Sequence, residues 1–521
     1  MKKFNKYIPD GAKVELSANV VSFEVEIYNI EQVISDLHNV GKLPLKLITA
    51  TVEQESQNQF RIWYVFGAPD CRMFIVPYIR LQNTQKFPSV TAIVHKALNF
   101  ERKIKTFFGL TPIGHPDLRP IILHDNWPDD IYPLRKNVNG CIKPLCNNGN
   151  YKFQKLDGES VYEIPVGPIH AGIIEPGYFR FSVVGEEIML LEPRLGFTHK
   201  GSEKLFETLA INDCIKLSEK ISGDSSFSHS LCFCQALEMV SGIVPSRRAQ
   251  FLRVIYAELE RLANHFGDIG AIMVDTGFNF GGANGARLRE IIMRLNERIG
   301  GNRFLRGINV VGGANKDISN EEKQFLQNEL VNIAKDFDEL IKITETSATL
   351  LNRLKGTGKL EQNIAKDFGI LGVAARATGI RIDARLDFPY AAYDQLMHEK
   401  IEVLTNGDVL SRFLIRIKEV FAALRIIQAT LDQLPAGEIT EKAAKTILKK
   451  NSLAISIVEG WRGEIIYFVT TDSEGNINRV FPLDPSFVNW SVLPYAAVGN
   501  IVPDFPLINK SFNLSYSGND L

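Results

Sequence analysis

The sequence changes character twice along its length, and this constrains the fold more than any other feature. Up to residue 108, short runs rich in β-branched and aromatic residues alternate with segments of helical spacing. Residues 109–136 are dense in proline, aspartate and asparagine, which predicts a mostly irregular segment. From Gly201 onward, long stretches have the spacing of amphipathic helices. We therefore predict an α+β fold, with an α/β unit followed by a mainly α-helical unit.

A polar stretch at residues 137–158, rich in asparagine and glycine, predicts a linker. We expect two domains, at residues 1–150 and 151–521, the second beginning with a small β-sheet. In the first domain the pattern predicts strands at 23–28, 45–52, 60–65 and 73–78, and helices at 30–40 and 90–108. In the second it predicts strands at 178–184 and 187–192, helices after Pro245 and at 320–354, 408–434 and 438–450, and a β-hairpin at 464–470 and 477–481.

Composition excludes several classes of protein. The 521 residues include 59 Lys and Arg against 60 Asp and Glu, a formal net charge of -1, which argues against a nucleic-acid binder. Six cysteines in so long a chain are too few for a disulfide scaffold. The basic start lacks the apolar core of a signal peptide, and no stretch reaches the ~18 apolar residues of a membrane span. We expect an intracellular protein without a direct membrane span.

Three local patterns are better explained by structure than by chemistry. The glycine-rich stretch at 277–285 lacks a phosphate-binding order, which favours a tight turn or a close backbone contact. Cys232 and Cys234 would point to different faces of a helix and are predicted to be small core residues. Glu258, Arg261 and His265 share one helix face, where an interhelical row of ion pairs is favoured over catalysis.

Several longer motifs together resemble known families. GHPDLR at 114–119 and PLRK at 133–136 resemble the small hydrophilic quinone-side subunit of respiratory complex I. GPIHAGIIEPGYFRF (167–181), RLGFTHKGSEKLFE (194–207), the segments 244–270 and 376–396 and the end of the chain resemble the quinone-pocket subunit of complex I. They also resemble the large subunit of energy-converting nickel–iron hydrogenases. The order of these two parts in one chain resembles that in the large subunit of formate hydrogenlyase-type hydrogenases. The resemblance covers nearly the whole chain.

The resemblance implies a metal site whose ligands this chain lacks. The hydrogenases hold nickel and iron with two CxxC pairs, since thiolates are soft, anionic and able to bridge metals. The first pair matches KISGDSSFSHS (220–230) and the second matches NLSYSG (513–518), so the ligand positions hold Ser222, Ser225, Ser515 and Gly518. Serine hydroxyls stay protonated near neutral pH and bind soft metals poorly, and glycine has no side chain. No nickel–iron centre, and no other bound metal, is therefore predicted.

The complex I branch of the resemblance implies a quinone site that is also incomplete. This chain keeps one histidine of that site, His170, but has Gly223 at the position that the resemblance gives to a quinone-binding tyrosine. Glu175 matches a glutamate near the hydrogenase site and is a candidate proton-handling group, or a buried ion-pair partner of Arg376 or Arg381. A proton or quinone cavity would thus contain His170, Glu175, Arg376 and Asp383. His199 and Lys200 match a segment that lies beside the iron–sulfur cluster of a partner protein.

Two classes of function remain open. The first is a core hydrophilic subunit of a membrane-associated, complex I-like or hydrogenase-4-like oxidoreductase complex, with electron transfer coupled to ion translocation and quinone as a candidate acceptor. The second is a non-redox scaffold or coupling subunit of an ion-translocating assembly. An active hydrogenase is a third reading that the lost ligands argue against. An open polar cavity lined by Glu175, His170 and Ser222 would favour the first class, and a cavity filled by side chains the second.

The resemblance also implies partners and a location. The expected partners are a small iron–sulfur subunit with a [4Fe-4S] cluster and antiporter-like membrane subunits, with no nucleic acid among them. We expect the chain in the cytoplasm, peripheral on the inner face of the cell membrane.

Overall fold

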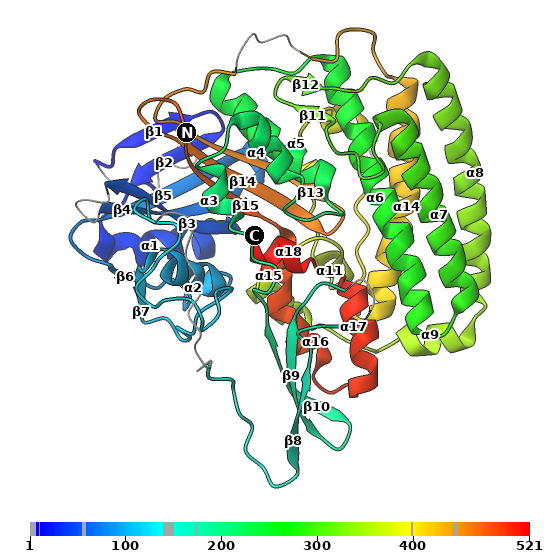
Figure 1. The fold of residues 1–521 in the computed structure, drawn as a ribbon, viewed down its shortest axis with the longest axis horizontal. Helices are drawn as coiled ribbons and strands as arrows, with labels where there is room; N and C mark the ends of the chain where they lie inside the picture. The colour runs from blue at the N-terminus through cyan, green and yellow to red at the C-terminus, as the bar shows by residue number, and fades with distance from the viewer. Residues whose placement is uncertain are drawn as a thin grey trace.

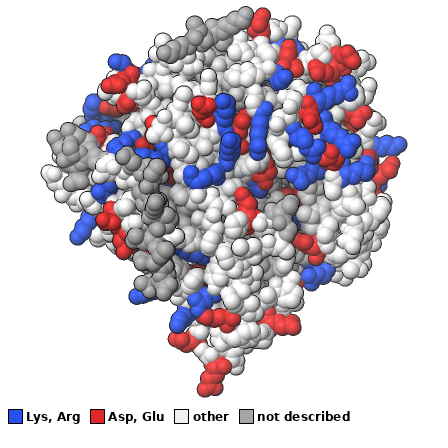
Figure 2. Space-filling view, viewed as in Figure 1, with Lys and Arg blue, Asp and Glu red and all other residues white. Residues whose placement is uncertain are grey.

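The computed structural model describes residues 7–9, 11–54, 59–138, 151–171, 174–397, 400–440 and 446–521. It has an N-terminal sheet, a largely helical remainder and a projecting hairpin sheet, as the α+β prediction required (Figure 1). On the face shown in Figure 2, basic and acidic side chains are interspersed, in keeping with the formal net charge of -1. Among the described residues, no helix combines the length and the apolar character needed to cross a bilayer.

The N-terminal sheet has five strands in the order β1-β2-β5-β4-β3. Only β2 and β5 pair in parallel, and the other neighbours are antiparallel. The predicted helix at 30–40 is confirmed as α1 continued by a π-helical turn over Asp36–Val40. The bounds are β1 Val14–Ser17, β2 Val20–Glu24, β3 Leu45–Gln54, β4 Gln59–Ala68, β5 Met73–Leu81, α1 Ile30–Ser35 and α2 Ala97–Phe108.

Two predicted elements of this unit have different bounds. The strand predicted at 23–28 ends at Glu24, and residues 27–29 form a 3-10 turn. The helix predicted at 90–108 begins only at Ala97, because residues 89–91 fold back onto a buried glutamate of the helix. Glu101 accepts hydrogen bonds from the Val90 amide at 2.8 Å and the Thr91 hydroxyl at 3.0 Å. Satisfying this buried carboxylate prevents the preceding residues from continuing the helix.

The segment that follows is irregular, as predicted. Between Gly109 and Val138 the one regular element is a short strand, β7 Thr111–Ile113, which pairs in parallel with β6 Lys86–Pro88. After the undescribed residues, a three-stranded antiparallel sheet projects from the body (Figure 1, bottom). Its strands are β8 Val161–Val166, β9 Tyr178–Val184 and β10 Glu187–Arg194; β9 and β10 were predicted and β8 was not.

Long helices form the other side of the molecule, where α6, α7, α8 and α14 lie side by side (Figure 1). The glycine-rich stretch enters α7, and a Cβ on Gly285 would stand 2.6 Å from the Gly270 Cα of α6. The predicted close backbone contact is therefore confirmed, between two helices. The bounds are α3 Ser202–Phe206, α4 Ile211–Ser218, α5 Ser226–Ser241, α6 Arg247–Asp275, α7 Asn279–Gly300, α8 Asn320–Glu345, α9 Ala348–Leu354, α10 Gln362–Asp367, α11 Gly372–Ala377, α12 Ala384–Asp387, α13 Tyr393–Leu396 and α14 Val409–Asp432.

The helix predicted at 438–450 is wrong for its described residues. Thr440 instead forms an isolated β-bridge with Gly313, and its hydroxyl donates to the Ala314 carbonyl at 2.6 Å. This pairing extends the two-stranded ladder of β11 Asn309–Val310 and β12 Gly313–Ala314 and holds the backbone extended. Residues 441–445 lie outside the described part of the chain, and residues 446–449 have no regular structure.

A second antiparallel sheet, β13-β14-β15, lies between the N-terminal sheet and the helices (Figure 1). All residues of β13 and β14 are buried, with α5 packed on the sheet from the helical side. The predicted hairpin is its second half, β14 to β15. The bounds are β13 Leu453–Gly460, β14 Gly463–Thr471, β15 Ile477–Leu483, α15 Pro485–Asn489, α16 Leu493–Ala497, α17 Phe505–Phe512 and α18 Tyr516–Asp520.

A buried ion pair joins the N-terminal sheet to this central sheet. The Lys46 Nζ of β3 lies 2.7 Å from both carboxylate oxygens of Glu464 in β14, and both side chains are almost fully buried. Ser17 and Asn19 of the first unit also donate to backbone carbonyls of β13, at 2.7 and 2.9 Å. The two parts of the chain therefore share one core, which includes buried residues from both.

We predict that Lys46→Met lowers the free energy of unfolding by about 3 kcal/mol, because it leaves the Glu464 carboxylate buried without its cation. Chemical denaturation followed by tryptophan fluorescence measures the change. The double variant Lys46→Met/Glu464→Met should regain most of the loss, and Lys13→Met, at an exposed lysine, is the matched control. A Lys46→Met variant as stable as the control would contradict this role of the pair.

Candidate functional site

The four positions that match metal-ligating cysteines meet in space. Ser222 and Ser225 form the turn that leads into α5, and Ser515 and Gly518 lie at the start of α18. The Ser222 Oγ is 2.8 Å from the Ser515 Oγ, so the two hydroxyls are hydrogen-bonded directly to each other. The Ser515 Oγ in turn caps α18 by accepting from the Gly518 amide at 2.9 Å.

A carboxylate fills the space beside Gly518. A Cβ at this position would stand 2.6 Å from the Asp484 Cγ, closer than side chains tolerate. The Asp484 Oδ2 is 3.0 Å from the His229 Nε2, and the other imidazole nitrogen is 3.1 Å from the Tyr467 hydroxyl. Burial disfavours the charged carboxylate, but the hydrogen bond and charge of His229 outweigh it and hold the pKa of Asp484 below its ordinary value.

An arginine and an aspartate close the site on the Ser222 side. The Arg462 guanidinium contacts both Asp224 carboxylate oxygens, at 2.7 and 2.6 Å, and lies 3.3 Å from the Ser222 Oγ. It also stacks on the Trp461 ring, 3.9 Å from the centroid. Burial works against the Asp224 charge, and Arg462 more than compensates, so the pKa of Asp224 is lowered. The site is thus a packed network of hydroxyl, carboxylate and guanidinium groups.

These residues do not fit a nickel–iron centre. Two thiolates on one tetrahedral ion at roughly 2.3 Å stand about 3.8 Å apart, whereas the two serine oxygens share a hydrogen bond. Neutral hydroxyls are hard and weak donors, and no donor atom is available from Gly518. Within the described ranges, no group of three or more His, Cys, Asp and Glu side chains is arranged to hold a metal ion. Cys232 and Cys234 are buried in α5, as predicted, with the Cys232 Sγ 3.3 Å from the Ser456 hydroxyl.

The structure places Glu175 beside the serine network, whereas His170 contacts the backbone of the turn before β9. A Glu175 carboxylate oxygen accepts from the Ser517 amide at 3.1 Å, at the N-terminus of α18. This contact replaces the alternative ion pair with Arg376 or Arg381. The His170 Nε2 lies 2.7 Å from the Gly177 carbonyl and fixes the turn before β9. Both side chains are half-buried.

Arg376 and Asp383 belong to a different network, on the far side of the β13–β14 turn. Arg376 contacts Glu459 at 2.9 Å and Glu419 at 2.8 Å, and Asp383 pairs with Arg385 at 2.7 Å. The row predicted on α6 is part of it: Arg385 and Arg261 contact Glu258 at 3.0 and 3.1 Å, and the His265 Nε2 lies 2.8 Å from Glu419. The interhelical ion-pair interpretation is therefore confirmed. A cavity of about 320 Å³ reaches this network from the surface.

His199 and Lys200 lie where the C-terminus returns to the loop after β10. The His199 Nδ1 is 2.8 Å from the Asp520 carbonyl, and burial lowers the pKa of this imidazole. The Lys200 Nζ is 3.4 Å from the carbonyls of Ile221 and Ser517, which adjoin the two serine positions. Lys200 therefore bridges the two halves of the serine network, a contact that sequence reasoning did not foresee.

The motifs of the first unit hold the two units together. Asp117 and Arg119 of GHPDLR pair at 2.8 Å, and Arg119 also contacts Glu192 of β10. From the second unit, Arg194 donates to the carbonyls of Pro120 and Leu123, both at 2.9 Å. The irregular segment is thus fixed against β10, directly before the loop that carries His199.

Comparisons with known proteins agree with this arrangement. The respiratory-chain NADH dehydrogenase 30 Kd subunit family matches residues 23–141, and the 49 Kd subunit family matches residues 275–456. Formate hydrogenlyase subunit 5 of Escherichia coli K12 is 32% identical over 91% of this chain and 84% of its own length. Hydrogenase-4 component G of the same organism is 31% identical over 96% of this chain and 88% of its own. The C/D subunit of NADH-quinone oxidoreductase from Phocaeicola vulgatus is 31% identical over 77% of this chain and 80% of its own length.

The fold and these matches define a fused subunit in which a 30 Kd-like unit precedes a 49 Kd-like unit. The chain belongs to the family of complex I-like and hydrogenase subunits that includes formate hydrogenlyase subunit 5 and hydrogenase-4 component G.

We predict that Gly518→Ala lowers the thermal midpoint by several degrees, because its Cβ would overlap the Asp484 carboxylate. Overpacking of this kind typically costs about 1–3 kcal/mol. Gly223→Ala is the matched control, since a Cβ there has its nearest neighbour, Arg306, at 3.6 Å. Differential scanning calorimetry compares them, and equal midpoints would show that Asp484 does not occupy the Gly518 side of the site.

We also predict a pH-dependent effect of Asp224→Asn. The lowered pKa of Asp224 means that the pair with Arg462 stabilises the fold at neutral pH and loses this effect as the pH falls through a value below 3.8. The variant should therefore be less stable than the parent at pH 7, and the gap should narrow toward pH 3. Denaturation at a series of pH values measures it, and a gap that widens on acidification would contradict the sign.

Proposed function

We propose that this chain is the core hydrophilic subunit of a membrane-associated, ion-translocating oxidoreductase complex related to complex I and hydrogenase-4, working without a nickel–iron centre. The family membership supports the type of complex. The observation that carries the rest is the direct hydrogen bond between Ser222 and Ser515, at 2.8 Å, where the hydrogenase resemblance places metal ligands. A packed network of this kind argues against hydrogen activation at that position by the family's metal.

The partners in this proposal are a small subunit with a [4Fe-4S] cluster and antiporter-like membrane subunits. Exposed apolar residues support a docking role for the projecting hairpin sheet. Ile169 is 87% exposed and lies beside His170, and Tyr162 and Met189 of the same sheet are exposed as well. Large apolar side chains gathered on one projection are typical of a surface that binds other subunits. The proposal places the chain at the cytoplasmic face of the membrane, as the membrane-associated type of complex suggests.

A coupling role without redox chemistry in this chain is the second candidate, and one observation favours it. Side chains fill the former metal position, since Asp484 takes the place beside Gly518 and Arg462 lies against Ser222. Arg462 follows closely after Glu459 and Gly460 in the sequence. Glu459 is part of the buried ion-pair network, and the Gly460 carbonyl accepts a hydrogen bond from that network. Movement of the turn that carries Arg462 would therefore change contacts in both the serine network and the ion-pair network.

The test uses the intact complex from cells grown with nickel. The complex is isolated from native membranes through a tag on this chain. We expect the iron–sulfur subunit to co-purify, with nickel at the level of a nickel-free preparation and no hydrogen-dependent dye reduction. Cluster reduction by a low-potential donor, followed by reoxidation with a water-soluble quinone, separates the two candidates: fast reoxidation supports electron transfer, and none supports the coupling role. Stoichiometric nickel with hydrogen oxidation would overturn the proposal.

A matched pair of variants tests the site itself. Ser222→Val should impair quinone-dependent reoxidation or ion uptake in membrane vesicles, because it removes the hydroxyl that links Asp224 to Ser515. Ser241→Val is the control, since within the described residues that hydroxyl bonds only to carbonyls of its own helix. Equal activity of the two variants would show that the serine network is not used.

A further inference from the structure

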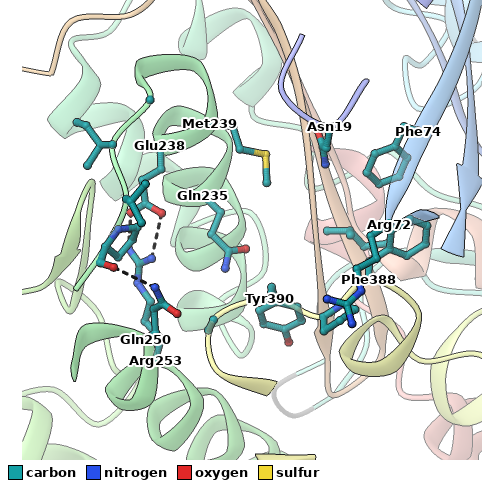
Figure 3. Close-up of a pocket in the computed structure, with 17 residues that line it drawn as sticks. Asn19, Arg72, Phe74, Gln235, Glu238, Met239, Gln250, Arg253, Phe388 and Tyr390 are labelled. Atoms are coloured by element: carbon teal, nitrogen blue, oxygen red, sulfur yellow. Dashed lines mark hydrogen bonds and ion pairs between the residues drawn. The ribbon is translucent and has the colours of Figure 1, made fainter. Parts of the chain in front are cut away.

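A cavity lies away from the serine network, between the N-terminal sheet and the helices. It has a volume of about 500 Å³, within the range of small-molecule sites. Figure 3 shows its two walls. Gln235 and Met239 of α5 and Gln250 and Arg253 of α6 form one wall. Asn19, Arg72 and Phe74 of the first unit form the other, together with Phe388 and Tyr390.

Three polar side chains in this lining have unused hydrogen-bonding capacity. The Asn19 Oδ1 is buried and accepts no hydrogen bond from any described residue, although its amide nitrogen donates to Ile455. The Arg253 Nε is buried and likewise finds no acceptor in the described ranges. Gln235 is only 8% exposed, and its amide has no partner within the described part of the chain. In Figure 3 this amide extends into the space between the walls.

Buried polar atoms without partners are uncommon, because each costs free energy. Two of them, the Asn19 Oδ1 and the Arg253 Nε, belong to this lining beside the Gln235 amide, and together they indicate a polar molecule that supplies the missing partners. The pattern also constrains the hydrogen-bonding groups of that molecule. The molecule must donate a hydrogen bond to the Asn19 Oδ1 and accept one from the Arg253 Nε. At the Gln235 amide it can either donate or accept.

The charge balance favours an anion. Arg253 is neutralised by Glu238, whose carboxylate contacts the guanidinium at 2.6 and 3.0 Å. Arg72, in contrast, is exposed at the rim and makes no ion pair with any described residue. Because the charges of Arg253 and Glu238 cancel, the charge of Arg72 leaves the lining of the cavity net positive.

The wall opposite Gln235 is aromatic and rigid. The rings of Phe74 and Phe388 are stacked with centroids 5.0 Å apart and an interplanar angle of 5°. The Tyr390 hydroxyl accepts from the Glu459 amide at 3.1 Å, which fixes this third ring. Aromatic walls of fixed orientation favour a planar ring in the ligand.

We propose that this cavity binds a small organic anion, consisting of a planar aromatic or heteroaromatic ring that carries a carboxylate or a phosphate group. Arg72 contacts the anionic group, Gln235, Asn19 and Arg253 hydrogen-bond polar atoms of the ring, and the aromatic wall covers one ring face. Because residues from both units line the cavity, the ligand would also strengthen their contact. This site is separate from the serine network and does not depend on the function proposed above.

Isothermal titration calorimetry of the full-length chain tests the proposal with two charged probes and their neutral counterparts. AMP is compared with adenosine, and 4-hydroxybenzoate with 4-hydroxybenzamide. We expect one of the anions to bind with one site per chain, about tenfold or more tighter than its neutral counterpart. Stronger binding of AMP would assign the phosphate class, and stronger binding of 4-hydroxybenzoate the carboxylate class.

Two variants locate the binding. Arg72→Gln and Gln235→Leu should each weaken binding of the better anion about tenfold, while Lys335→Gln, at an exposed lysine of α8, should not. Thermal midpoints without ligand confirm that the variants fold. Binding that either pocket variant leaves unchanged, equal binding of the neutral counterpart, or no binding of either anion would each overturn the proposal.

Discussion

A sheet buried on both faces is the constraint on which the rest of this structure depends. In β13 and β14 every residue is buried, so each face must be covered by another part of the chain. The helix α5 covers one face, and the N-terminal unit reaches the other through Lys46 and the β1–β2 turn. The loop between β13 and β14 carries Arg462 to the serine network. The two units and the candidate site are therefore held by one element.

Much of this could be predicted from sequence, because the signals were local. Alternating and helical periodicities located β3, β4, β5, α1, α6 and α14 within a few residues. The helix start at Ala97 was missed because it depends on how residues 89–91 satisfy Glu101. The strand-like pairing of Thr440 with Gly313 was missed for a similar reason, since helical spacing says nothing of a partner 127 positions away. Strand β8 was missed because Pro165 interrupts its VYEIPV run, and proline is tolerated here at the edge of the sheet.

The sequence could select candidate residues for a site, but it could not predict how they are arranged in space. Resemblance selected Ser222, Ser225, Ser515 and Gly518, and the structure brings these segments together. Of the residues that fill the site, His229 lies in the matched segment 220–230, where it received no role, whereas Asp484 and Arg462 belong to no motif that was singled out for chemistry. Their roles arise from tertiary contacts between β14, α5 and the start of α15. Arg376 and Asp383 were grouped with Glu175 by resemblance, whereas the structure assigns them to the Glu459 and Glu419 network.

Ordinary polar groups fill the place where the hydrogenase resemblance expects metal ligands. Hydroxyls, a carboxylate–imidazole pair and a guanidinium satisfy one another at hydrogen-bond distance, so the interior stays polar without unpaired charge. Such a network retains the connection between the C-terminal helix and the α5 turn.

The most direct test of this account is a cryo-EM structure of the intact complex from nickel-grown cells, at a resolution that shows side-chain oxygens and metals. The account predicts Ser222 and Ser515 in direct contact, with the Asp484 carboxylate against Gly518 and continuous density for protein alone. Density for a metal ion or a bound molecule between the two serines, with their hydroxyls apart, would contradict it.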